Sequence, residues 1–315
     1  MNVTKNEFKV LSSDGIHTLS GVIYVPDGEV KGFFHIVHGM TEYIGRYDKI
    51  MSELTQEGWI CFGYDNLGHG HTVNDKSELG FIASKKGWDL LCKDVKVFCD
   101  AVRAHFPHLS ELPYVLMGHS MGSFIVRLAS EKYVHPDKLI IMGTGGSNPA
   151  AAPGLILIEL IKLFRGKKHV SKLIYKLAFG GYNKPFTSES DTLPDAPQPW
   201  ITNDSNVRKA YMNDEFCNFL FSVTAMGDLI RLMKYSNRRA WFKNLPKDIP
   251  VLLVSGKDDP VGNFGCGVEQ VYSRLKKQNA IVERKLYTNA RHEILNDITY
   301  PEVKKDILSF LQKSF

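Results

Sequence analysis

Residues 118–122 have the types and spacing of a tight turn that could present a nucleophile. They read Gly118-His-Ser-Met-Gly122, a G-x-S-x-G sequence, with an apolar run at 114–117 before them and a helical pattern at Met121–Lys132 after them. Strand, sharp turn and helix form the context in which a serine is presented as a nucleophile. The two glycines let strand and helix approach without Cβ clashes. We therefore predict that Ser120 projects from the carboxyl edge of a sheet, beside a helix N-terminus that favours negative charge.

A serine hydroxyl needs a base, and the chain supplies one downstream of an acid. Residues 251–260 are an apolar strand that runs into a turn with Asp258 and Asp259, and His292 follows the next predicted strand. The order serine, acid, histidine is typical of one fold among those that host such a triad. We predict that His292 takes the serine proton and that Asp259 orients it. Spacing alone does not exclude Asp258 as the acid that orients His292. Whichever of the two carboxylates does not orient His292 is expected to cap the turn.

The loop at His38-Gly-Met40 follows the apolar run Gly32–Val37. Attack on a carbonyl develops negative charge on its oxygen, which backbone N–H groups in this loop and after the nucleophile can hold. We assign these two N–H groups to Met40 and Met121. This chemistry needs no metal and no organic cofactor. His69-Gly-His71 lacks the spaced partners of a metal site, so we expect it to be structural.

Short apolar runs alternate with helical patterns along most of the chain. Strands are predicted at 8–11, 19–25, 32–37, 59–64, 114–117, 138–142, 251–254 and 281–287, the first two antiparallel. Helices are predicted at 46–57, 88–105, 121–132, 267–277 and 302–313. Continuous apolar runs are typical of strands that are buried on both faces. The pattern predicts an α/β protein with a doubly wound, mostly parallel eight-stranded sheet and a helical lid insertion.

The alternation breaks between residues 147 and 240, where no buried strand is predicted. Helical stretches lie there at 155–164, 171–178, 207–220 and 225–235, around a proline-rich connection at 185–199. We predict an α/β core at 1–146 and 241–315 and a lid at 147–240, whose last part can belong to a core helix.

The first stretch of the predicted lid, 155–164, is apolar nearly all round. Basic residues follow it, at Arg165, Lys167, Lys168, Lys172 and Lys176. One interpretation, which we favour, is a lid helix buried against the core with its lysines in solvent. The other is peripheral contact with a membrane surface through the lid.

Several motifs together resemble the monoacylglycerol lipase and lysophospholipase-like branch of the α/β-hydrolases, of the serine aminopeptidase S33 type. They are Val37-His-Gly-Met-Thr-Glu42, Tyr64-Asp-Asn-Leu-Gly-His-Gly70, residues 118–122, Gly256-Lys-Asp-Asp-Pro260 and Ala290-Arg-His-Glu-Ile-Leu295. By position, the resemblance implies that Ser120 is the nucleophile, Asp259 the acid and His292 the base. It also implies that Met40 and Met121 form the oxyanion hole, that Asp65 supports the active-site loops, and that a lid shapes an acyl-chain tunnel.

The implied activity is hydrolysis of a carboxylic ester with one acyl chain, such as a monoacylglycerol or lysophospholipid, through an acyl-enzyme on Ser120. A thioesterase, an amidase or an aminopeptidase on the same fold are alternatives. An aminopeptidase would need a lid carboxylate to hold the substrate amine. The lid offers Glu159, Glu189, Asp191, Asp195, Asp204, Asp214, Glu215 and Asp228. A non-catalytic protein that binds a small apolar ligand is a further alternative, which an intact serine, aspartate and histidine set disfavours.

The bulk composition is that of a globular protein, and the resemblance implies a small-molecule ester or lipid as its partner. The formal net charge is +5, with the basic residues spread along the chain, which argues against nucleic-acid binding. The N-terminus has no apolar signal region, and no apolar stretch reaches the ~18 residues that a membrane span needs. Five cysteines without metal-ligand spacing are expected to be reduced, buried thiols. These features predict a cytoplasmic protein.

Overall fold

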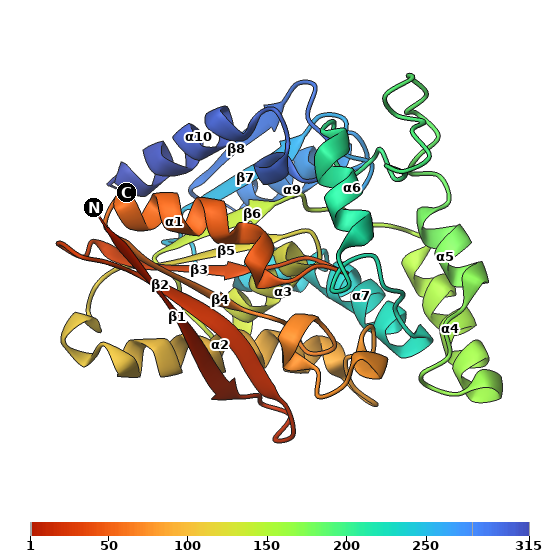
Figure 1. The fold of residues 1–315 in the computed structure, drawn as a ribbon, viewed down its shortest axis with the longest axis horizontal. Helices are drawn as coiled ribbons and strands as arrows, with labels where there is room; N and C mark the ends of the chain where they lie inside the picture. Colours follow the sequence, from red (N-terminus) through yellow and green to blue (C-terminus); the bar gives the residue numbers. More distant parts are fainter. Residues whose placement is uncertain (1, 279, 315) are drawn as a thin grey trace.

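The computed structural model describes residues 2–278 and 280–314, and within them it has one eight-stranded sheet (Figure 1). The strands are β1 (Val3–Leu11), β2 (Thr18–Pro26), β3 (Gly32–Val37), β4 (Trp59–Tyr64), β5 (Tyr114–His119), β6 (Lys138–Met142), β7 (Val251–Gly256) and β8 (Val282–Tyr287). Their order is β1-β2-β4-β3-β5-β6-β7-β8. β1 and β2 pair antiparallel with each other, as do β2 and β4, and the remaining pairs are parallel. The predicted fold class is therefore confirmed.

Helices cover both faces of this sheet, because its central strands alternate between two apolar layers. On β5, Leu116 packs in one core cluster with helices α2 and α3, whereas Val115 and Met117 pack in the other with α1 and α10. The helices of the sheet layers are α1 (Asp48–Gln56), α2 (Gly87–His105), α3 (Met121–Lys132), α8 (Arg239–Asn244), α9 (Cys266–Lys276) and α10 (Tyr300–Gln312). The continuous apolar runs in the sequence follow from this two-sided burial.

The strand order reverses direction around β3, which lies between β4 and β5. In an open α/β sheet, ligands bind at such a reversal, outside the carboxyl ends of the strands. The loop after β3 and the turn after β5 meet there. These are the two segments that hold Met40 and Ser120.

The chain between β6 and β7 contains four longer helices. They are α4 (Ala151–Arg165), α5 (Lys172–Phe179), α6 (Ser205–Asn213) and α7 (Val223–Ser236). In Figure 1, α4 and α5 lie at the side of the molecule, farthest from the sheet. α7 instead packs against α2 and α3, and its Met226 and Leu232 belong to the core cluster of those helices. The boundaries 147 and 240 of a lid stay a prediction.

Burial of α4 against the core, the interpretation that we favoured from sequence, holds for one face of the helix only. Only Ala151 and Ile158 of α4 are buried. Large apolar side chains of α4 and α5 are instead exposed, at Ile156, Leu160, Leu163, Phe164, Leu173 and Leu177. The apolar side chains of α4 therefore lie on two faces, one that packs on the protein and one that faces solvent.

The predicted helix at 207–220 is also wrong beyond Asn213, where α6 ends. The carboxylate of Asp214 accepts the backbone N–H of Phe216 at 2.9 Å and the hydroxyl of Tyr43 at 2.9 Å. A short polar side chain that bonds to the backbone two residues later stabilises a turn in place of a helix. Asn218, with φ of 54°, then directs the chain into an extended segment.

Two other expectations concern single features of the chain. Cys61, Cys92, Cys99 and Cys217 are buried free thiols, as expected, but Cys266 is exposed at the first position of α9. Within residues 2–278 and 280–314, no helix is long and apolar enough to span a membrane.

Candidate active site

Ser120 lies at the junction of β5 and α3 in a strained conformation, with φ of 53° and ψ of −117°. Its N–H donates to the carbonyl of Met142 in β6 at 3.0 Å. Positive φ costs a residue with a side chain on the order of 1–3 kcal/mol, so the surroundings must enforce it. A Cβ on Gly122 would lie 2.1 Å from the carbonyl oxygen of Val37, and one on Gly118 would lie 2.3 Å from the carbonyl oxygen of Gly122. Glycine at both positions therefore permits the close contact that forces the serine outward.

His292 and Asp259 form a buried pair. The Nδ1 atom of His292 lies 2.9 Å from Oδ2 of Asp259, which is fully buried. The same carboxylate accepts the hydroxyl of Ser255 at 3.2 Å and the N–H of Val261 at 2.8 Å. Asp258 is half-buried, and its carboxylate has no hydrogen-bond partner in the described part of the chain. The structure thus brings Asp259, and not Asp258, to His292, and Nε2 of the imidazole is left to accept a proton.

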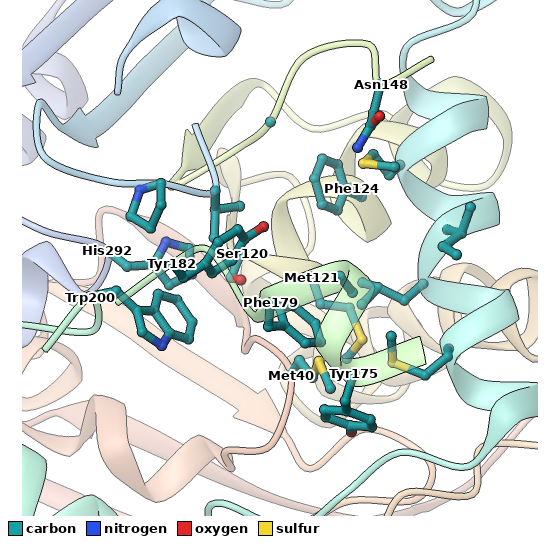
Figure 2. Close-up of a pocket in the computed structure, with 18 of the residues that line it drawn as sticks. Met40, Ser120, Met121, Phe124, Asn148, Tyr175, Phe179, Tyr182, Trp200 and His292 are labelled. Carbon is teal, nitrogen blue, oxygen red and sulfur yellow. The ribbon is translucent and has the colours of Figure 1, made fainter. Parts of the chain in front are cut away.

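The imidazole of His292 is adjacent to the turn that carries Ser120. Its ring centroid is 4.8 Å from that of His119, the residue before the serine. A Cβ on Gly143 would lie 3.2 Å from both of these rings, so the backbone at Gly143 packs closely against the two imidazoles. Ser120 and His292 line one cavity, as Figure 2 shows.

Met40 and Met121 line the same cavity. A Cβ on Gly39 would lie 3.1 Å from Cβ of Ser120, so the loop after β3 passes directly beside the serine. Met121 is the first residue of α3, where the helix has no internal acceptor for the N–H group. Within the described residues, neither of the two methionine N–H groups has a hydrogen-bond acceptor. Two unused donors thus lie next to Ser120.

A buried carboxylate, Glu42, fixes the loop after β3. It accepts the N–H of Gly39 at 2.6 Å and the hydroxyl of Tyr47 at 2.9 Å, and it lies 3.2 Å from Nδ1 of His119. Burial alone would raise the pKa of Glu42, but His119 and Arg46 outweigh burial and lower it. Burial alone would lower the pKa of His119, but Glu42 outweighs it and raises that pKa. This pair was missed from sequence, although both residues lie in the motifs quoted above.

Arg46 extends this network to the loop of His292. Its guanidinium contacts Glu42 at 3.1 Å and both carboxylate oxygens of Glu293, at 2.5 and 2.7 Å. Glu293 directly follows His292. The loop after β3, the turn at Ser120 and the loop of His292 are therefore joined by buried, charge-assisted hydrogen bonds. Sequence gives no spacing signal for this contact, because 247 residues separate Arg46 from Glu293.

The cavity has a volume of about 820 Å³ and two kinds of wall. Its apolar wall comes from α4, α5 and α7, with Leu157, Ile174, Leu177, Leu229, Ile230 and Met233. Polar side chains from the connecting loops and from α9 complete the lining, among them Asn148, Gln198 and Asn218 and, on α9, Gln270. The two carboxylates in the lining, Glu42 and Glu293, are both bonded to Arg46.

Two other histidines near the strand ends, His69 and His71, make contacts that stabilise loops. His69 is buried with its ring 5.3 Å from that of Phe219, and burial lowers its pKa to about 3. His71 lies 3.3 Å from Asp65. Asp65 also accepts the backbone N–H groups of Ile44 and His71, at 2.8 and 2.7 Å. It therefore ties the loop after β3 to the loop after β4.

Known proteins resemble the chain in sequence and in fold. It is 23% identical over 283 residues to a monoglyceride lipase homolog of Monkeypox virus, covering 90% of this chain and 88% of that protein. It is 26% identical over 307 residues to the monoglyceride lipase of Saccharomyces cerevisiae, covering 90% of this chain and 86% of the relative. A thermostable carboxyl esterase from Bacillus coagulans, solved with glycerol, has a TM-score of 0.89 at 27% identity, with 98% of each chain covered. The family described as serine aminopeptidase, S33, matches residues 28–299, so the chain belongs to this family of α/β-hydrolases.

Proposed function

We propose that this protein is a serine hydrolase of carboxylic esters with a single acyl chain, monoacylglycerols being the leading class. One observation carries the proposal. Ser120, the His292–Asp259 pair and two unused backbone donors border a cavity whose far wall is apolar. The monoglyceride lipases and the carboxyl esterase that resemble the chain support the same class of substrate.

In the proposed mechanism, Oγ of Ser120 attacks the ester carbonyl while Nε2 of His292 takes its proton. Asp259 holds His292 in the productive tautomer and stabilises its charged form. The N–H groups of Met40 and Met121 hold the negative charge on the carbonyl oxygen. His292 then protonates the departing alcohol. Water attacks the acyl-enzyme with the same base and releases the carboxylic acid.

The apolar wall is the proposed site of the acyl chain. It spans α4, α5 and α7, through side chains such as Leu157, Ile174 and Leu229. Each buried methylene gains about 0.8 kcal/mol on leaving water, so affinity should rise with chain length until the wall ends. The polar side chains, such as Gln198 and Asn218, suit the hydroxyl groups of the alcohol part.

The lid carboxylates argue against the aminopeptidase alternative. None of the eight acidic residues named from sequence is among the residues that line the cavity. Asp191 pairs with Arg291 and Glu159 with Arg231, so these charges are already matched elsewhere. Without a free carboxylate in the lining, a substrate ammonium group would have to leave water unpaired, which is costly.

A labelling and turnover experiment tests the proposal. The protein is treated with a fluorophosphonate, the adduct is located by peptide mass spectrometry, and hydrolysis of monooleoylglycerol is compared with that of leucine p-nitroanilide. We expect an adduct on Ser120 and turnover of the ester only, both lost in Ser120→Ala. Turnover of the anilide without the ester would favour the aminopeptidase. An adduct on another residue would refute the assignment of Ser120.

We further propose that the outer face of α4 and α5 contacts an anionic lipid surface. Leu163 and Phe164 are 76% and 79% exposed, next to other exposed apolar side chains. The basic residues that follow α4 and lie along α5 are exposed as well, at Arg165, Lys167, Lys168, Lys172 and Lys176. An apolar face bordered by cations binds lipid through burial and through attraction to anionic headgroups. The inner faces of the same helices line the cavity, so a lipid would have a short path to the site.

Vesicle flotation tests this contact. Binding is compared for phosphatidylcholine vesicles with and without phosphatidylglycerol, at low and high salt. We expect binding that needs the anionic lipid, weakens with salt and falls in the double variant Leu163→Asp, Phe164→Asp. Ile16→Asp is the matched control, because Ile16 is 72% exposed in the turn between β1 and β2. Equal flotation of both variants would refute the contact.

A further inference from the structure

Residues 186–204, which we name the strap, have neither helix nor strand and connect α5 with α6. The strap lies against the loop that carries His292. The N–H of His292 donates to the carbonyl of Trp200 at 3.3 Å, and the N–H of Glu293 donates to the carbonyl of Ile201 at 2.8 Å. The ring of Trp200 is 5.2 Å from that of His292 (Figure 2). The imidazole is thus held by Asp259 on one side and bordered by the strap on another.

Arg291, the residue before His292, gathers the strap. Its Nη2 atom lies 2.6 Å from Oδ1 of Asp191, its Nη1 donates to the carbonyl of Pro199 at 2.7 Å, and its guanidinium lies 4.3 Å above the ring of Phe186. The side chains of Arg291 and Asp191 are 9% and 7% exposed. A planar guanidinium can make these separate contacts from one side chain, which the single ammonium group of a lysine cannot match. One side chain therefore contacts the beginning, the middle and the later part of the strap.

Arg208, from α6, holds the strap from its other side. Its guanidinium is fully buried and donates to the carbonyls of Ala196 at 3.0 Å and Thr202 at 2.8 Å, and to that of Ser190 at 2.5 Å. Backbone carbonyls that are buried in a segment without regular structure need hydrogen-bond partners. Two arginines supply them here, and one of the two, Arg291, is covalently next to His292.

From these contacts we infer that Asp191 and Arg291 are positioning residues for His292, so that the segment between β6 and β7 fixes the general base. The inference rests on the proposed function, which makes His292 that base. A base that moves by a fraction of an ångström loses its alignment with the serine proton. The apolar wall of the cavity comes from α4, α5 and α7 and not from the strap, so we expect binding of the acyl chain to change little. Loss of the ion pair should therefore lower kcat and leave KM nearly unchanged.

The test compares Asp191→Asn with Asp195→Asn. Asp195 lies in the same strap and pairs with Lys209 at 2.9 Å, but both side chains are exposed. We expect Asp191→Asn to lower kcat on the order of 10-fold to 100-fold with KM within about twofold of the wild type. Asp195→Asn should match the wild type. Arg291→Lys keeps the charge but cannot contact both Asp191 and the carbonyl of Pro199, so it should lower kcat as well. The double variant Asp191→Asn, Arg291→Lys should lose less activation free energy than the two single variants added together. A kcat unchanged in both single variants, or a rise in KM alone, would overturn the inference.

A readout that needs no turnover separates this inference from the proposed function. We expect the proton between His292 Nδ1 and Asp259 to give a far-downfield resonance in the proton NMR spectrum of the unmodified enzyme. It should broaden or vanish in Asp191→Asn and persist in Asp195→Asn, with circular dichroism unchanged in both. If the wild type hydrolyses no ester but the resonance responds in this way, the proposed function fails and the positioning role stands. If the wild type is active and the resonance is the same in all three proteins, the positioning role fails.

Discussion

The turn at Ser120 and the helix pair α4–α5 border the same cavity but are built in opposite ways. Around the turn, backbone atoms approach so closely that a single Cβ on Gly122 would lie 2.1 Å from a carbonyl oxygen. On α4, a Cβ on Gly154 would lie 3.6 Å from its nearest neighbour, the Cδ1 atom of Ile230, which is ordinary contact. The first region is fixed by packing, whereas the second presents large apolar side chains to solvent.

This difference separates two tasks. Reacting groups have to be held in one geometry, which requires strained backbone and buried hydrogen bonds. A surface that receives an acyl chain needs apolar area and tolerates variation in shape. We therefore expect substitutions near the turn to change rate or folding, and substitutions on α4, α5 and α7 to change which substrates are used.

The largest expected effect tests the closely packed region around Ser120 and His292. Asp259→Asn should lower kcat by about 10⁴-fold, because an amide favours the wrong tautomer of His292. Asp258→Asn, one residue away and without a side-chain hydrogen bond among the described residues, should stay near the wild type. Steady-state hydrolysis of monooleoylglycerol measures both. Equal losses in the two variants would contradict the assignment of the pair.

The next effect compares packing in the two regions directly. Gly122→Ala should lower the free energy of unfolding by about 3 kcal/mol or more, because the new methyl group overlaps backbone atoms that cannot move aside. Gly154→Ala has room and should raise the free energy of unfolding by up to about 1 kcal/mol through helix propensity. Urea denaturation curves report both values. Similar free energies of unfolding for the two variants would contradict the proposed difference in packing around Gly122 and Gly154.

A third prediction concerns α7, which joins the cavity wall to the core. Asp228 is buried beside Gly87 at the N-terminus of α2, and burial raises its pKa from 3.8 to about 6. The folded protein thus holds a proton between about pH 4 and pH 6 that the unfolded chain releases. This contribution to stability is present at the acid end of that window and is lost as pH rises through it, by about 2–3 kcal/mol. In Asp228→Asn, the free energy of unfolding should no longer fall in this way between about pH 4 and pH 6, as unfolding curves at several pH values would show. An unchanged fall would refute Asp228 as its cause.

The smallest expected effect tests the apolar cavity wall on α4, α5 and α7. Leu229→Trp fills part of the apolar wall on α7 and should lower kcat/KM for a palmitoyl ester roughly tenfold, with little change for a butanoyl ester. Leu160→Trp, on the exposed face of α4 and outside the cavity lining, is the control. A loss that is equal for both chain lengths would place the acyl chain elsewhere.

Local sequence signals were sufficient for the sheet, for the residues that follow the strands and for the helices of its two layers except α8, where no helix was predicted. The strand periodicity predicted all eight strands, and the turn at 118–122 predicted where Ser120 would lie. The same signals failed for 207–220, because the side chain of Asp214 competes with the helix through a local hydrogen bond. They also failed for α4, because an apolar pattern does not show which of its faces finds a partner.

By itself, the sequence determined the order of strands and helices and the three residue types that could perform acyl transfer, since both follow from periodicity and from motifs of a few residues. Only the tertiary structure decided between Asp258 and Asp259, brought Arg46 to Glu293, and placed the strap against His292 through Asp191 and Arg291. These contacts join segments far apart in the chain. Their distances depend on how the loops pack over the sheet, which no local pattern of residues encodes.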